Sequence, residues 1–254
     1  MNSREATAVM RAFVSTVVVL AVTFLSTRSP ADDDGGWTSL FDGKSLNGWR
    51  VKCRPEDSDK TGYWRVVDGT ITAETSPGSK HDYIWLLTEK EFDDFELRLK
   101  VQTYSKTKGN SGIQIRSRYD DDAKWLDGPQ VDINPPGPWR CGFIYDETRE
   151  AKVWLYPNVG GPANAKPEHA PKNLKWFHAD NDNTWNEVHI VCKGTRIGTT
   201  INGVIVADYE GKGRLDDEAH RSHNVGVKGH IGLQIHPGED LLIRFKDIEV
   251  RKAK

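Results

Sequence analysis

The fold is indicated most clearly by residues 92–103, which read FDDFELRLKVQT. Every second position in this stretch carries a large apolar side chain: Phe95, Leu97, Leu99 and Val101. The positions between them are mostly charged. Successive side chains of a β-strand point to opposite faces of its sheet. This period of two therefore predicts a strand with one buried face.

Short stretches of the same kind recur along the chain, separated by residues that favour turns. The pairs Asp68-Gly69 and Asn202-Gly203 are typical of two-residue turns between antiparallel strands. We find no long helical period, no internal repeat and no linker between two cores. Many short strands in one chain predict an all-β fold, a jelly-roll sandwich of two curved antiparallel sheets. One outer face is then expected to be concave, with loops around its rim.

Composition limits the classes of function. The chain has 254 residues, which is enough for one large β domain or two small ones. The formal net charge is −2, and charges of both signs are interspersed. We find no basic stripe with interleaved aromatic residues, so the sequence gives no indication of a nucleic-acid partner.

The N-terminus has the features of a secretory signal peptide. Arg4 and Arg11 precede a short apolar run over residues 12–25, and small residues follow near Ser29 and Ala31. We predict a signal peptide over residues 1–31, with cleavage after Ser29 as the alternative and an uncleaved anchor as the rival interpretation. Residues 32–254 then form a single domain, secreted or periplasmic, with no stable membrane span after cleavage.

The cysteines are odd in number: Cys53, Cys141 and Cys192. At least one thiol must therefore stay unpaired in an oxidising compartment. Their spacing fits no zinc motif, and the sequence does not choose a disulfide among them. Cys192 lies in an apolar alternation and is expected to be buried.

A second informative stretch covers residues 109–145, GNSGIQIRSRYDDDAKWLDGPQVDINPPGPWRCGFIY. It contains two predicted neighbouring strands, each with an apolar face. Strict alternation places polar side chains on the opposite faces: Gln114, Arg116, Arg118, Gln130 and Asp132. Such a face can simply be solvated, but Trp125 and Trp139 in the linking segments favour a ligand site, because large aromatic side chains are costly to leave in water.

The strand over residues 229–236, GHIGLQIH, repeats this pattern. Its polar face is expected to carry His230, Gln234 and His236. If these strands share a sheet, His236 lies near Asp132 and Arg116. Histidine exchanges protons near neutral pH, a carboxylate can orient it or act as a base, and arginine can hold an oxyanion. The alternative for His236 is a turn residue before Pro237. We expect the remaining loop histidines to be exposed: His169, His178, His220 and His223.

Several motifs occur in the order found in one known family: FDGKSLNGW, FDDFELRLKVQ, GNSGIQIRSR, GPQVDI, CGFIYDETR and GHIGLQIHPGEDLLIRFKDIEVRK. Over about residues 36–252 the chain resembles the 3-keto-disaccharide hydrolase domain family. That family is similar in fold to concanavalin A-like lectins and glucanases. The resemblance implies a bacterial exported protein that acts on glycosides whose 3-hydroxyl has been oxidised to a ketone.

The implied chemistry is removal of the C2 proton, expulsion of the C1 substituent and addition of water. The resemblance and the strand pattern together imply that Asp132 or His236 is the base, that the other is the acid, and that Arg116 stabilises the enolate. The implied substrate-binding residues are Gln130, Gln234, Asn110 and Arg118, with Trp139 and Tyr145 as walls. A functional partnership with a sugar 3-oxidoreductase follows, because the ketone must be made first.

No cofactor is evident, although a divalent metal could polarise a ketone. The run of Asp120 to Asp122 lacks the spacing of a calcium loop and is expected to be a solvated turn. An ordinary retaining glucanase needs two carboxyl groups, whereas Gln130 and Asn134 are amides. The remaining alternatives are a non-catalytic, lectin-like carbohydrate-binding module and a structural or adhesive exported domain.

Overall fold

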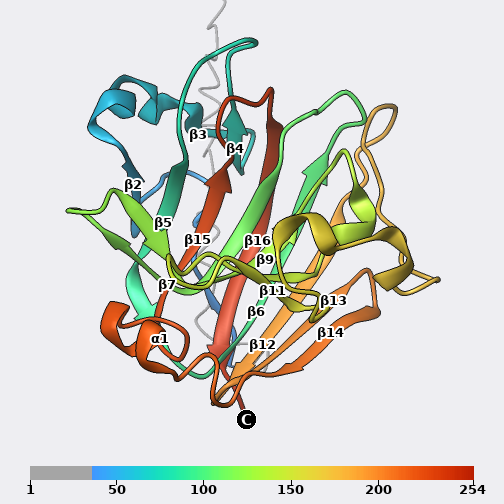
Figure 1. The fold of residues 1–254 in the computed structure, drawn as a ribbon. Helices are drawn as coiled ribbons and strands as arrows, with labels where there is room; N and C mark the ends of the chain where they lie inside the picture. Colours follow the sequence, from blue (N-terminus) through green and yellow to red (C-terminus); the bar gives the residue numbers. More distant parts are fainter. Residues whose placement is uncertain (1–35) are drawn as a thin grey trace, which may run out of the picture. The chain divides into compact units, whose positions relative to one another are not determined.

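The computed structural model describes residues 36–254, which form two antiparallel β-sheets packed face to face (Figure 1). The predicted jelly-roll sandwich is confirmed. The predicted signal peptide, residues 1–31, lies outside the described residues. Within residues 36–254, no helix is long and apolar enough to cross a membrane.

The first sheet, sheet A, consists of β1 (Thr38–Ser39), β3 (Trp64–Val67), β4 (Thr70–Glu74), β6 (Phe95–Thr103), β12 (Asn186–Lys193), β13 (Arg196–Ile201), β14 (Val204–Glu210) and β16 (Leu242–Lys252). Its strand order is β14-β13-β12-β6-β16-β4-β3, and β1 pairs with β16. Residues from both ends of the described chain thus lie side by side in this sheet.

The second sheet, sheet B, consists of β2 (Trp49–Cys53), β5 (Ile84–Phe92), β7 (Ser111–Asp120), β8 (Trp125–Asp127), β9 (Pro129–Ile133), β10 (Ile144–Asp146), β11 (Val153–Tyr156) and β15 (Gly229–Ile235). Its order is β11-β10-β9-β7-β15-β5-β2, and β8 pairs with β7. The strands expected to share a polar face, β7, β9 and β15, are therefore neighbours in one sheet, as Figure 1 shows.

Short helical segments connect the strands. The 3₁₀ turns are η1 (Pro55–Tyr63), η2 (Pro138–Arg140), η3 (Pro162–Asn164) and η4 (Pro167–His169), and the α-helix α1 covers Glu218–His223. The turns η2, η3 and η4 follow β9 and β11, and residues of η2 and η3 line the site described below, which lies on the outer face of sheet B.

The core lies between the sheets and contains the alternating residues that the sequence predicts. Phe95, Leu97, Leu99 and Val101 of β6 are all buried in it. Both predicted hairpin turns are present, because Asp68 and Asn202 adopt positive φ angles of 48° and 49°, as a tight two-residue turn requires. The three cysteines are free thiols; Cys141 and Cys192 are buried and Cys53 is partly exposed.

A β-bulge in β7 breaks the strict alternation on which the site prediction depended. Ser117 pairs with His230 and Gln114 pairs with Gly232, so β7 has one residue more than β15 in this interval. Arg116, within the bulge, has a φ of 50°. A bulge re-aims the side chains that follow it. Ile115 before the bulge lies in the main core, whereas Tyr119 beyond it lies in a second apolar cluster with Trp85, Leu87 and Leu126.

Helix α1 is fixed to the sandwich through His220, which is completely buried and not exposed as the sequence predicted. Its Nε2 atom lies 3.2 Å from Oδ2 of Asp146, and its Nδ1 atom lies 2.8 Å from Oδ1 of Asp217. Burial opposes the charged imidazolium, but these two carboxylates outweigh it and raise the pKa of His220. The folded protein therefore favours a protonated His220 between two carboxylates.

The substitution His220→Gln tests how much the contacts of protonated His220 with Asp146 and Asp217 stabilise the fold. Because the pKa of His220 is raised in the folded state, this stabilisation is complete below the unfolded pKa of about 6.5. It is lost as pH rises through the folded-state pKa. We expect His220→Gln to lower the free energy of unfolding by about 3 kcal/mol at about pH 6, and by less at about pH 9. Urea unfolding at both pH values measures the loss of unfolding free energy. An equal loss at the two pH values would contradict a role for protonated His220.

Candidate active site

A cavity of about 550 Å³ opens on the outer face of sheet B, over β9 and β10 and beside the end of β15. We call it the cleft. It is lined by Tyr83, Lys108, Asn110, Trp125, Gln130, Asp132, Asn134, Pro136, Arg140, Tyr145, Glu147, Lys152, Trp154, Pro162, His236 and Glu239. The lining combines aromatic walls with a dense set of carboxyl, amide and cationic groups, which is typical of a polar ligand site.

Asp132 and Arg140 form a buried ion pair at the base of the cleft. Asp132 lies on β9 and is 1% exposed. Nε of Arg140 donates to Oδ2 of Asp132 at 2.8 Å, and Nη2 donates to Oδ1 at 3.3 Å. Burial raises the pKa of Asp132 above its ordinary value, although the Arg140 guanidinium opposes this shift. The two-pronged contact fixes the guanidinium in one orientation.

His236 lies just beyond the end of β15 and forms a pair with Glu239. Its Nδ1 atom lies 3.2 Å from Oε1 of Glu239, and its Nε2 atom lies 3.3 Å from the Tyr83 hydroxyl. Burial alone would raise the pKa of Glu239, but contacts from His236 and from the Asn110 backbone lower it. Burial also raises the pKa of Tyr83. An ionised Glu239 can therefore orient the imidazole, while Tyr83 remains a neutral phenol.

Glu147 supplies a carboxyl group with an unusual proton affinity. It follows β10 directly and is 9% exposed. Burial raises its pKa to about 7, against the opposing charges of His236 and Lys152. The ammonium of Lys152 lies 4.2 Å from the centre of the Trp125 ring, at the edge of the cleft. Glu147 can thus hold a proton at neutral pH, which is the requirement for a general acid.

The floor beside these groups is built from amides on three neighbouring strands. Nε2 of Gln114 donates to Oε1 of Gln130 at 2.7 Å. A Cβ atom on Gly112 would lie 2.2 Å from Oε1 of Gln130, so only glycine leaves room for that side chain. The amide of Gln234 is buried and interacts with the carboxyl group of Glu147, whose pKa it lowers slightly against the effect of burial. Of these amides, Gln130 reaches the cleft surface.

The cleft brings together five of the nine residues predicted from the sequence: Asp132, His236, Gln130, Asn110 and Tyr145. Gln234 is fully buried on β15 and does not line the cavity. Trp139 lines a neighbouring groove. Arg116 and Arg118 lie elsewhere.

The prediction that Arg116 shares a surface with Asp132 and His236 is wrong. Its side chain is 0% exposed and its guanidinium is saturated by other partners. Nε donates to the Asp93 carbonyl at 2.6 Å, Nη1 to the Gly194 carbonyl at 2.5 Å and Nη2 to Asp94 at 2.9 Å. The bulge in β7 turns this side chain away from the cleft. Arg116 joins loops at the other end of the sandwich.

Arg118 is also absent from the cleft, for the same reason. It donates to Glu91 at 2.5 Å and to the Asn224 carbonyl at 3.3 Å. His230 lies in that neighbourhood, where Nε2 is 3.6 Å from Glu91 and 3.2 Å from Arg50. These residues form a structural network on the far side of the bulge.

Among the cleft residues that the sequence did not predict are three charged ones that carry the chemistry proposed below: Arg140, Glu147 and Glu239. Each follows a strand or lies in a turn, where alternation makes no prediction. The sequence contained a weak indication of each residue. Arg140 follows Trp139, and Glu239 lies three residues after His236. Glu147 lies in the motif CGFIYDETR, which resembles the family.

The described residues contain no grouping of three or more His, Cys, Asp or Glu side chains that could hold a metal ion. Both oxygens of Asp132 accept from Arg140, and Nδ1 of His236 faces Glu239. These side chains therefore do not present a ready ligand set, and a divalent metal stays a prediction. Asp120 accepts hydrogen bonds from the backbone of Asp122 and Ala123, as a turn residue does.

Arg116 and Arg118 of β7 differ in burial, and this difference can be tested by protein stability. Arg116→Lys keeps the charge but cannot reach three carbonyl and carboxylate partners at once. We expect it to lower the free energy of unfolding by about 3 kcal/mol. The matched control Arg118→Lys, on a side chain that is 34% exposed, should cost less than about 1 kcal/mol. Urea unfolding of both variants measures the difference; equal losses would contradict a structural role special to Arg116.

Comparison with known proteins identifies the family of this chain. Residues 36–251 match the model of a family described as the 3-keto-alpha-glucoside-1,2-lyase-like domain. A curated relative, a 3-keto-disaccharide hydrolase of Bacteroides thetaiotaomicron, is 25% identical over 250 residues, which cover 89% of this chain and 81% of the relative.

Solved structures show the same fold. A putative glycosyl hydrolase of Parabacteroides distasonis superposes with a TM-score of 0.55 at 15% identity, over 86% of this chain and 95% of the other. A second from that organism gives a TM-score of 0.50 at 24% identity, over 85% and 98%. The family resemblance seen in the sequence is confirmed, and this chain belongs to the 3-keto-alpha-glucoside-1,2-lyase-like domain family.

Proposed function

We propose that this protein cleaves 3-keto-glycosides by proton abstraction at C2, elimination of the C1 substituent and addition of water. The observation that carries the proposal is the content of the cleft, where a base, an acid and a cation line one cavity: His236 with Glu239, Glu147, and Arg140. The family and its curated relative support a carbohydrate-active role.

The chemistry sets the requirements. A ketone at C3 acidifies the proton at C2, because the electron pair left behind is delocalised onto the C3 oxygen as an enolate. The enolate then re-forms the ketone, makes a C1=C2 double bond and expels the C1 oxygen, which needs a proton. Water adds at C1 and a proton returns to C2. One base, one enolate stabiliser and one acid are therefore required.

His236 is assigned as the base. Glu239 faces Nδ1, so Nε2 is the nitrogen that would accept the C2 proton, with the substrate replacing the Tyr83 hydroxyl that lies 3.3 Å from it. Arg140 replaces Arg116 as the enolate stabiliser, since its guanidinium lines the cleft. Asp132 holds that guanidinium with both oxygens and so acts as a positioning residue. Glu147, whose pKa of about 7 leaves about half of the molecules protonated at pH 7, donates the proton to the leaving oxygen.

The substrate would be held by groups around this centre. The amides of Asn110, Gln130 and Asn134 line the cleft and can bind sugar hydroxyls. Tyr145 and Trp154, whose ring centres lie 5.0 Å apart, form a wall. Tyr83 and Trp125 form another, with ring centres 5.2 Å apart. An apolar wall excludes water and strengthens the polar contacts inside.

The proposed reaction also requires a source of oxidised substrate and a compartment in which the two enzymes meet. A 3-keto-glycoside must be produced by an oxidoreductase acting on the 3-hydroxyl, so a functional partnership with such an enzyme follows. The predicted signal peptide places the reaction outside the cytoplasm, and N-terminal sequencing of the protein from a periplasmic or secreted fraction tests this. Metal dependence is tested by assay with and without a chelator.

Turnover tests the proposal directly. Wild-type protein should release nitrophenol from a nitrophenyl 3-keto-glucoside and not from the unoxidised parent. His236→Gln and Arg140→Gln should each reduce turnover by about 100-fold or more, because each removes a group needed at the transition state. Trp185→Ala, outside the cleft, is the control. No release from either glucoside, with saturable binding of a plain glycan, would make this a binding module.

The pH dependence tests Glu147. An acid must be protonated, so the rate should fall as pH rises through about 7, the pKa of Glu147. For a methyl 3-keto-glucoside, whose leaving group needs a proton, we expect Glu147→Gln to remove this descending limb and to lower kcat by about 100-fold. For a nitrophenyl 3-keto-glucoside, whose leaving group is stable as an anion, the loss should be small. Equal losses on both substrates would rule out the acid role.

A further inference from the structure

The two ends of the cleft carry different groups. Strands β9 and β15 both run antiparallel to β7, so they finish at the same end, where the cleft holds Asn134, Arg140 and His236. Glu147 lies at the other end of β9 and β10, because its amide donates to the carbonyl of Gly128, just before β9, at 3.0 Å. In the proposed reaction His236 takes the C2 proton and Glu147 protonates the leaving oxygen. The leaving group therefore extends toward the Glu147 end of the cleft.

Lys152 supplies a cation at that end. It comes directly before β11, whose first residue Val153 pairs with Asp146, so Lys152 lies opposite Glu147. Its ammonium lies 4.2 Å from the centre of the Trp125 ring, and Nε1 of Trp125 donates to the Glu147 carbonyl at 2.8 Å. In the sheet, β11 pairs with β10 and β8 pairs with β7, so the two residues approach from opposite sides of β9. The Lys152 side chain thus crosses the leaving-group end of the cleft.

The ammonium of Lys152 is free to bind a ligand. Within residues 36–254 it forms neither an ion pair nor a hydrogen bond, and its contact is with the Trp125 ring. An indole face attracts a cation without using the N–H donors of that cation. The guanidinium of Arg140, by contrast, is already held by both oxygens of Asp132. Lys152 therefore offers a positive charge and hydrogen-bond donors beside the position of the leaving oxygen.

The cleft as a whole has an excess of positive charge in its reactive state, although the formal net charge of the chain is −2. Its lining contains three permanent cations: Lys108, Arg140 and Lys152. When the acid Glu147 holds its proton and the base His236 is neutral, the lining contains two carboxylates: Asp132 and Glu239. A cavity with this charge is complementary to an anionic ligand and attracts it.

We propose that Lys152 binds a carboxylate on the leaving group, which makes the protein selective for 3-keto-glycosides of alcohols that carry an acid group. The inference rests on the proposed function and narrows its substrate class. The carboxylate accepts from the ammonium, while protonated Glu147 reaches the glycosidic oxygen beside it. A charge-assisted hydrogen bond of this kind is stronger than one between neutral groups. The carboxylate can belong to a hydroxy acid or to a uronic acid residue.

Lys108 provides a matched comparison for Lys152. It lines the same cleft, carries the same charge and is likewise exposed. It lies just before Asn110 and Ser111, and Ser111 pairs with Ile133 at the end of β9. Lys108 is therefore at the end opposite Glu147, where it does not meet the leaving group.

Turnover of paired substrates tests the assignment. Carboxymethyl and carbamoylmethyl 3-keto-glucosides have leaving groups of similar size, glycolate and glycolamide, that differ by one charge. We expect kcat/KM of the wild type to favour the acid by about tenfold or more. Lys152→Gln should remove this preference, Lys152→Arg should retain it, and Lys108→Gln should keep it within about threefold. Lys152 also lowers the pKa of Glu147, so Lys152→Gln can alter both rates; the ratio of the two isolates the contact with the carboxylate.

A second pair of substrates distinguishes the sources of the carboxylate. It consists of 3-keto-disaccharides whose leaving sugar is glucuronate or glucose. A preference that depends on Lys152 supports the inference in either pair, and the pair with the larger preference identifies a hydroxy acid or a uronic acid as the natural leaving group. If the wild type turns over these substrates with no such preference in either pair, the proposed function stands and this inference is overturned.

Binding decides the outcome if the wild type turns over no 3-keto-glycoside. The unoxidised forms of both pairs cannot react by the proposed route, so calorimetric titration measures recognition alone. Binding of an acid that is about tenfold tighter than binding of its neutral partner, in the wild type and not in Lys152→Gln, supports a carboxylate site at Lys152 although the proposed function has failed. Equal binding within both pairs overturns the inference.

Discussion

The buried contact between Asp132 and Arg140 is the interaction on which the site depends. A carboxylate on β9 that is 1% exposed is unfavourable unless it is paired. Its backbone is fixed by ladder bonds, since Asp132 N donates to the Phe143 carbonyl and Gly142 N donates to the Asp132 carbonyl, both at 2.9 Å. The chain between these points must fold back over the strand so that Arg140 reaches the carboxylate.

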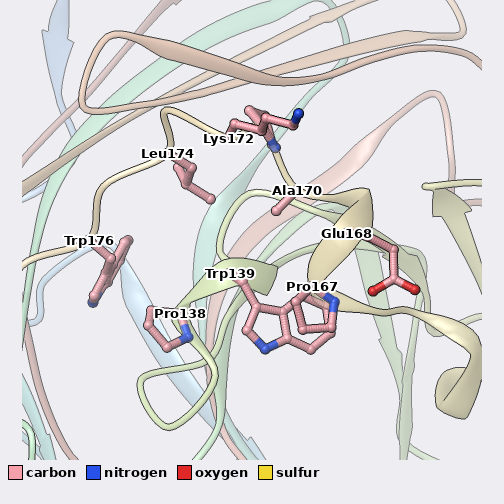
Figure 2. A pocket seen from close by; sticks show the side chains of 9 residues that line it. Pro138, Trp139, Pro167, Glu168, Ala170, Lys172, Leu174 and Trp176 are labelled. Atoms are coloured by element: carbon pink, nitrogen blue, oxygen red, sulfur yellow. The ribbon is translucent and has the colours of Figure 1, made fainter.

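The turn between β9 and β10 carries different side chains on its two sides. On the side of the cleft, the guanidinium of Arg140 lies with Glu147, His236 and Glu239. On the other side, the preceding residue Trp139 lines a neighbouring groove (Figure 2). One turn, held by one ion pair, thus sets the positions of both Arg140 and Trp139. Glu147 shows the cost of this arrangement, because the burial that gives it a pKa of about 7 also removes a carboxyl group from water.

Alternation predicted much of the fold and part of the site. It placed β6, the hairpins and the apolar faces of β7, β9 and β15 correctly, because one face of each strand must be buried against the other sheet. It found Asp132 and Gln130 because β9 is regular. It failed for Arg116, because a one-residue bulge is visible only in the register between β7 and β15. His220 was misplaced because its two carboxylate partners come from a distant strand and from its own helix cap. Arg140, Glu147 and Glu239 lie where the chain leaves the sheet, so only tertiary packing brings them together.

Isotope incorporation at C2 tests the central claim most directly. Wild-type protein is incubated with methyl 3-keto-glucoside in D₂O, and the released 3-keto-glucose is analysed by mass spectrometry and NMR, with a protein-free sample to correct for spontaneous exchange. Elimination followed by hydration takes the C2 proton away and returns a deuteron, so every product molecule should carry one solvent-derived deuterium at C2 from the earliest time point. Product that retains its original proton at C2 would show direct displacement at C1 and contradict the account.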